Sequence, residues 1–94
     1  MTKVTLKKVG FCRYLVKSEG HATGSTEACA ATSMLCYMLF GYLERTGAKV
    51  YKQVDEDGYM EIEFRGNRKL YDLIRTGYTM LHEAYSEYVN VQLE

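Results

Sequence analysis

Apolar and polar residues alternate along two stretches of the chain, and each stretch predicts a β-hairpin. In residues 2–19, apolar side chains stand at every second position on both sides of a Val-Gly pair at 9–10, which offers a turn. Residues 49–64 repeat this alternation around the sequence DEDG, in which Asp57-Gly58 is a favoured pair for a tight hairpin turn.

The residues after the first hairpin change to a helical pattern. Ser25 or Thr26 is a good N-cap for this helix, and an acidic residue in the first turn suits the helix dipole. We expect the helix to run to about Thr46, because Gly47 favours a C-terminal stop.

This first predicted helix carries no charged residue between Glu27 and Glu44. The uncharged run is short for a membrane span, and Thr32, Ser33 and Gly41 weaken that interpretation further. A helix this apolar is expected to be buried on most sides. One sheet in so small a chain cannot cover the whole circumference of a helix. We therefore expect a second helix or a second subunit to cover it, which favours a homodimer.

A second helix of roughly 20 residues is predicted after the second hairpin, with Asn67 as its N-cap. Its apolar stripe should face the sheet and its polar residues should face solvent. The stripe comprises Leu70, Leu73, Ile74, Gly77, Leu81, Ala84, Tyr85 and Tyr88, and the outward residues are Arg68, Asp72, Arg75, Thr79 and Glu83.

The sequence VNVQLE at the end of the chain fits a short final strand. The element order is then β-β-α-β-β-α(-β), which predicts an α+β fold: a mainly antiparallel sheet of two hairpins packed with two helices. At 94 residues, the chain is expected to form a single domain over residues 1–94.

The charge of the chain is balanced, because twelve basic and twelve acidic residues give a formal net charge of zero. Such a chain lacks the basic footprint that neutralises nucleic-acid phosphates, so we expect no direct nucleic-acid binding. A net charge near zero also weakens self-repulsion and makes self-association easier.

The cysteine count and the N-terminal sequence indicate a reducing compartment. Three cysteines are too few and too unevenly spaced for a disulfide framework. The N-terminal residues alternate and are charged, without the apolar segment of a signal peptide, so a cytoplasmic location is expected. No set of three or four metal ligands converges in the sequence, and neither a metal nor a cofactor is expected.

The stretch GHATGSTEACAATS, residues 20–33, joins the first hairpin to the first helix and carries the candidate chemistry. Cys29 falls in the first turns of the helix, where N–H groups and a partial positive charge stabilise a thiolate or hold an oxyanion. His21 lies at the end of a strand, and a loop with two glycines can fold it back over the helix start. The spacing permits a Cys–His dyad, and it also fits a small buried cysteine without chemistry.

Binding of an anion is the main alternative for this loop, because glycines, hydroxyls and a helix N-terminus can cradle a phosphate. A phosphate loop, however, needs a lysine after its last glycine, and Ser25 and Thr26 follow Gly24 here. The sequence signal for this alternative is weak.

The remaining cysteines, histidine and methionines are predicted to be structural. Cys12 and Cys36 lie within apolar runs, and His82 lies on the solvated, polar side of the second helix. We expect three methionines to fill the core: Met34, Met38 and Met60.

This arrangement resembles the ribosomal-processing cysteine proteases, the Prp or YsxB-like family. GHA closes a hairpin, a short loop follows, and a helix opens with CAATS, which is similar to the family's GHA…CA..S pattern. Both hairpins and both helices fall in the order of the family. The resemblance implies a small cytoplasmic homodimer. It also implies an endopeptidase that removes an N-terminal extension from a large-subunit ribosomal protein, cutting after an aromatic residue.

The resemblance assigns roles residue by residue. Cys29 matches the nucleophile and His21 the general base, while Gly20 and Ala22 match the residues that flank this histidine. Ser33 matches a serine one helical turn after the nucleophile, where it would hydrogen-bond near the site or to the helix carbonyls.

Two departures from the family pattern bear on specificity. The loop between His21 and Cys29 is about four residues shorter than is usual in the family. The aspartate that commonly stands three residues before the cysteine is Thr26 here, and the next residue, Glu27, is a hypothetical partner that orients His21. Two alternatives therefore stay open: a divergent paralogue with another peptide target, and a non-catalytic dimeric module that binds a peptide or a ribosomal partner.

Overall fold

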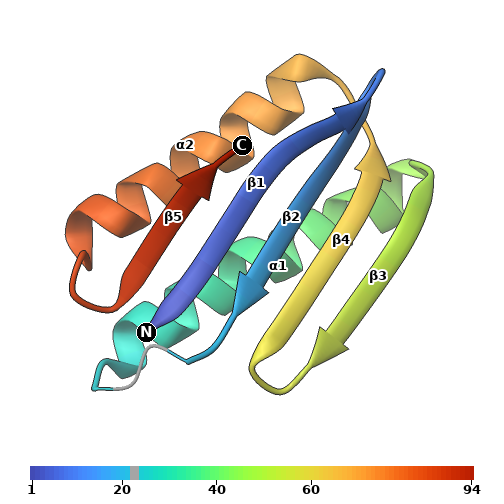
Figure 1. The fold of residues 1–94 in the computed structure, drawn as a ribbon. Helices are drawn as coiled ribbons and strands as arrows, with labels where there is room; N and C mark the ends of the chain where they lie inside the picture. Colours follow the sequence, from blue (N-terminus) through green and yellow to red (C-terminus); the bar gives the residue numbers. More distant parts are fainter. Residues whose placement is uncertain (22–23) are drawn as a thin grey trace.

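The computed structural model describes residues 1–21 and 24–94, and it confirms the predicted order of elements (Figure 1). The first hairpin consists of β1 (Thr2–Gly10) and β2 (Arg13–Glu19), and it precedes helix α1 (Thr26–Thr46). The second half contains β3 (Val50–Glu56), β4 (Tyr59–Arg65), helix α2 (Arg68–Ala84) and β5 (Val89–Leu93).

The strands form one mixed five-stranded sheet in the order β3-β4-β2-β1-β5. Both hairpins are antiparallel, and β2 pairs antiparallel with β4, as expected for a mainly antiparallel sheet. The final strand β5 instead pairs parallel with β1, since α2 carries the chain back along the sheet before it. Both helices cover the same face of the sheet, so the molecule has two layers (Figure 1).

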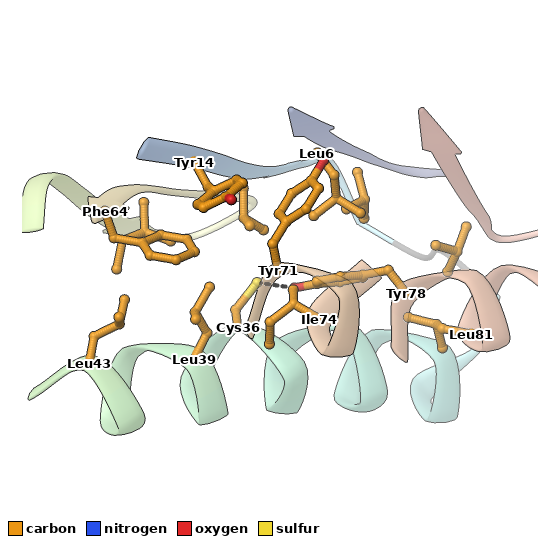
Figure 2. Close-up of a cluster of buried hydrophobic side chains, with 14 of the residues drawn as sticks. Leu6, Tyr14, Cys36, Leu39, Leu43, Phe64, Tyr71, Ile74, Tyr78 and Leu81 are labelled. Carbon is orange, nitrogen blue, oxygen red and sulfur yellow. Dashed lines mark hydrogen bonds between the residues drawn. The ribbon is translucent and has the colours of Figure 1, made fainter. Parts of the chain in front are cut away.

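The core lies between the sheet and the helices. Leu6, Val16 and Ile62 stand side by side on β1, β2 and β4 and are almost completely buried. Figure 2 shows the inward residues of the strands facing Leu39 of α1 and Ile74 of α2. Each such side chain contributes roughly 1.5–3 kcal/mol on burial, so this row fixes the helices against the sheet.

Both ends of α1 follow the predicted capping pattern. The Ser25 side chain accepts a hydrogen bond from the N–H of Ala28 at 3.1 Å, and Gly47 adopts a left-handed φ of 69°. These local interactions explain why the helix begins and ends where the sequence predicts.

The expectation that α1 is buried on most sides is wrong for the single chain. The fully buried residues of α1 form one stripe along the helix, namely Ala28, Thr32, Cys36, Leu39 and Leu43. Met34 and Met38 are therefore exposed and are not core residues as predicted, and two tyrosines share their face. That exposed face comprises Met34, Tyr37, Met38 and Tyr42. No helix among the described residues is long and apolar enough to cross a membrane.

The buried face of α2 differs in part from the prediction. Leu73 is 63% exposed, whereas Tyr71 and Tyr78 are buried beside Ile74 and Leu81. The two tyrosines displace the predicted stripe because their large rings bury more surface than a leucine. Helix α2 also ends at Ala84, so the last two tyrosines of the predicted stripe, Tyr85 and Tyr88, lie beyond it.

Two local predictions also require correction. The first hairpin turns at Phe11 and Cys12, not at residues 9–10, and Cys12 has a left-handed φ of 55°. Cys12 is therefore a turn residue and not part of an apolar strand. His82 is half-buried, and its Nδ1 atom lies 2.7 Å from the carbonyl oxygen of Val89. This histidine therefore joins α2 to β5 and is not fully solvated.

A buried hydrogen bond joins the two helices beneath the sheet. The thiol of Cys36 lies 2.8 Å from the hydroxyl of Tyr78 (Figure 2). Burial raises the pKa of the Cys36 thiol, and it raises the pKa of the Tyr78 phenol well above its usual range. Cys36 is therefore a structural residue, as predicted.

Replacing Tyr78 with Phe is expected to lower the free energy of unfolding by about 1 kcal/mol, because it removes this buried bond and keeps the ring. The matched Tyr71→Phe should have a smaller effect, since the Tyr71 hydroxyl bonds to no residue that the structure describes. Urea unfolding followed by circular dichroism measures both values. Equal losses in the two variants would contradict the assigned role of the Cys36–Tyr78 bond.

The raised pKa values also predict alkaline sensitivity. Above about pH 9, the ordinary pKa of a thiol, the folded chain retains protons that the unfolded chain loses, so stability falls as the pH rises. In the same unfolding measurement, Tyr78→Phe should show a shallower decline than the wild type.

Candidate active site

Four parts of the chain meet at one end of the sheet. The end of β2, the start of α1, the β3–β4 turn and the N-terminus all lie at the lower edge of Figure 1. They surround an open cavity of about 260 Å³. Four of the sequence-predicted site residues line it: Gly20, His21, Cys29 and Ser33.

Cys29 is the fourth residue of α1 and is partly exposed toward this cavity. Its N–H donates to the carbonyl of Ser25 at 3.2 Å, and the N–H of Ala28 is taken by the Ser25 side chain. In the described residues, the N–H groups of Thr26 and Glu27 have no such partner. The first turn of α1 presents these N–H groups and the positive end of the helix dipole, but neither Thr26 nor Glu27 is among the described residues that line the cavity.

His21 follows directly after β2, and its side chain is 54% exposed. The imidazole lies over the β3–β4 turn, with Nε2 3.8 Å from the Oδ1 atom of Asp57. No hydrogen bond joins His21 to Cys29 in the described part of the chain. The structure thus brings both side chains to one cavity, and the dyad itself stays a prediction.

Gly20 turns the chain out of β2 and sets the start of His21. Its φ is +85°, and a Cβ atom at this position would lie 2.6 Å from the carbonyl oxygen of Met1. The N–H of Gly20 also donates to the carbonyl of Gly58 at 2.8 Å. Only a residue without a side chain fits this close approach, so steric exclusion requires a glycine directly before the histidine.

The supporting residues divide into those at the cavity and those away from it. Ser33 lines the cavity, while the hydrogen bond back to a helix carbonyl is made by its neighbour Thr32, which donates to Ala28 at 2.8 Å. Glu27 is exposed and accepts a hydrogen bond from the Tyr85 hydroxyl at 3.3 Å. The carboxylate that faces His21 is that of Asp57. Ala22 lies outside the described residues.

The rim of the cavity includes acidic residues that sequence reasoning missed as site residues. Asp55, Glu56 and Asp57 line it, without a lysine or arginine among its described lining residues. The hydroxyl of Tyr37 donates to Oδ1 of Asp55 at 3.4 Å, and the charge of this aspartate raises the pKa of the tyrosine. The sequence predicts only a turn at residues 55–58, because nothing local shows which strand end this turn approaches.

No group of three or more metal-ligating side chains occurs in the described ranges 1–21 and 24–94. The side chains that line the cavity offer a thiol, an imidazole, hydroxyls and carboxylates.

Comparison with known proteins gives structural matches. No family model and no curated protein matches the sequence. The essential ribosomal processing protease Prp from S. aureus, in complex with a covalently linked product peptide, matches with a TM-score of 0.82 and 16% identity over 100% of both chains. The same protease with a substrate peptide gives a TM-score of 0.74 and 15% identity, again over 100% of both chains.

SMU.848 from Streptococcus mutans is 26% identical, with a TM-score of 0.71 over 99% of this chain and 93% of that one. The chain therefore has the Prp fold, with its β-β-α-β-β-α-β order and five-stranded mixed sheet. The resemblance predicted from the GHA and CAATS sequences is confirmed at the level of the fold.

Proposed function

We propose that this chain is a cysteine endopeptidase in which Cys29 is the nucleophile and His21 the general base. One observation carries the proposal: a single open cavity is lined by both residues, at the start of a helix, in a fold matched over its full length by a protease. That protease was captured with a substrate peptide and with a covalently linked product peptide. A peptide is accordingly the class of substrate that we propose.

The reaction follows from the groups at the cavity. The imidazole of His21 takes the proton of the Cys29 thiol, and the thiolate attacks the carbonyl carbon of the peptide bond. Backbone N–H groups at the start of α1, together with the positive end of the helix dipole, stabilise the oxyanion of the tetrahedral intermediate. The imidazolium returns the proton to the departing amine, and water then hydrolyses the thioester to release the acid and restore the thiol. Substrate binding must bring His21 and Cys29 together, as hydrogen bonds of uncomplexed active sites are often open.

The substrate that we propose is the N-terminal extension of a large-subunit ribosomal protein, or another cytoplasmic peptide cut after an aromatic residue. The Prp fold supports the first choice. The short connection between His21 and Cys29, and Thr26 in place of an aspartate, are departures that favour a divergent target.

Alkylation kinetics test the proposed dyad. Iodoacetamide at neutral pH should label Cys29 at least about tenfold faster than Cys12 or Cys36, because a thiolate reacts and a thiol does not. His21→Ala should remove this advantage, while the matched His82→Ala should preserve it. Mass spectrometry of the digested protein gives the three rates. Slow and equal labelling of the three cysteines would overturn the dyad and favour the non-catalytic module.

Cleavage of synthetic peptides tests the activity. Peptides from the N-termini of large-subunit ribosomal proteins should be cut after an aromatic residue, and Cys29→Ala should abolish cleavage while Cys12→Ala retains it. Because the rim carries three carboxylates, a substrate with lysines beside the cleaved bond should react faster than its glutamate counterpart at low salt. Peptides that bind without being cut would contradict the proposed activity.

We extend the proposal to a homodimer formed through the helix layer. The exposed face of α1 borders a mostly apolar groove of about 340 Å³ between α1 and α2. Met38 and Tyr42 line this groove opposite Leu70 and Leu73. A second copy would cover the exposed face of α1, which carries no charged side chain, whereas a lone chain leaves this face in water.

A double substitution, Met38→Lys with Tyr42→Lys, should halve the mass measured by sedimentation equilibrium. Phe11→Ser is the matched control, since Phe11 is 89% exposed on the β1–β2 turn and lies outside the helix layer. It should leave the mass unchanged. A monomeric wild type at micromolar concentration would overturn the dimer.

A further inference from the structure

We propose that the β3–β4 turn positions His21, and that Gly58 is the surface on which its imidazole rests. The inference rests on the proposed function, because it assigns a positioning residue to the same reaction. It concerns a segment more than 30 residues away in sequence from His21, which the structure places beneath the ring.

The space above Gly58 is filled by the imidazole. A Cβ atom at position 58 would lie 2.8 Å from Nε2 of His21 and 3.4 Å from both Cδ2 and Cε1. One side of the ring therefore sits directly against the backbone of the turn. Any side chain at this position would have to displace the ring, and a displacement of about 1 Å is enough to lower a catalytic rate substantially.

The same glycine also holds the backbone that leads into His21. Its carbonyl accepts the 2.8 Å hydrogen bond from the N–H of Gly20. The bond continues the antiparallel ladder of β2 and β4, in which Glu19 stands opposite Tyr59. Backbone and ring of His21 are thus both located by one residue, and the histidine is fixed relative to the sheet even though half of its side chain is exposed.

Asp57 adds a charge on the same turn. Its carboxylate lies 3.8 Å from Nε2, beyond hydrogen-bond distance, and its side chain is 99% exposed. It attracts the imidazolium that forms when His21 takes a proton, but solvent screens an ion pair of this kind. The steric contact of Gly58 is therefore the larger effect.

Two glycines with the same left-handed backbone conformation allow the effect on His21 to be separated from the effect on folding. Gly58 has a φ of +76° and Gly47 a φ of +69°, and alanine is strained at both, but a Cβ atom at Gly47 meets nothing within 4 Å. Gly58→Ala should slow Cys29 alkylation and lower kcat for peptide cleavage by at least about tenfold, with a smaller change in KM. Gly47→Ala should stay within about twofold of the wild type. Where alanine prevents folding, Gly58→Asn and Gly47→Asn give the same comparison, since asparagine tolerates this backbone region.

Carbon–proton NMR of the two histidine rings distinguishes a displacement of the His21 ring from a general loss of stability. Gly58→Ala should shift the ring signals of His21 and leave those of His82, which reports on α2 and β5. Unmoved His21 signals, or equal rates in the Gly58 and Gly47 variants, would overturn the positioning role. The two proposals can fail separately. If the wild type cuts no peptide and its Cys29 is alkylated slowly, the protease proposal is rejected. If Gly58→Ala still shifts the NMR signals of the His21 ring in that case, the contact between Gly58 and His21 is retained.

Discussion

The antiparallel pairing of β2 with β4 decides where the candidate site forms. Glu19, the last residue of β2, stands opposite Tyr59, the first residue of β4, so the chain that leaves β2 passes onto the β3–β4 turn. Gly20 extends this pairing by one hydrogen bond, and His21 comes to lie over Gly58. A one-residue slip in this register would send the side chains of β2 to the opposite face of the sheet and would remove the histidine from the cavity.

Helix α1 gives the cavity its second half and connects it to the core. Cys29 and Cys36 are two helical turns apart and lie near the same face, yet their surroundings differ. Cys36 is held by Tyr78 under the sheet, where burial keeps its thiol protonated. Cys29 lies where the sheet ends and is partly open to the cavity. The packing that fixes the rotation of the helix at Cys36 therefore also directs Cys29 toward the site.

The sequence predicts well those features that depend on interactions between residues close together in the chain. The capping residues Ser25, Gly47 and Asn67 all occur where expected, because each acts on backbone groups within a few residues. The side of α2 that is buried could not be read in the same way, since Leu73 and Tyr78 are both apolar enough to face the sheet and only the packing selects between them. The candidate site follows this division: its thiol and imidazole lie in one short stretch, while its rim comes from a distant hairpin.

The contact between His21 and the β3–β4 turn, which is distant in sequence, affects how accurately the imidazole is positioned. Among the described residues, His21 contacts Gly58 in the β3–β4 turn, and this turn leads directly into β4, which is paired on both sides within the sheet. Sites carried by paired strands and helices hold their groups more accurately than sites on loops alone. A shortened connection between His21 and Cys29 is compatible with the proposed chemistry on this account, because the two residues take their places from β2 and α1 separately. The length of that connection would then govern which peptides enter the cavity more than whether the thiol and imidazole share it.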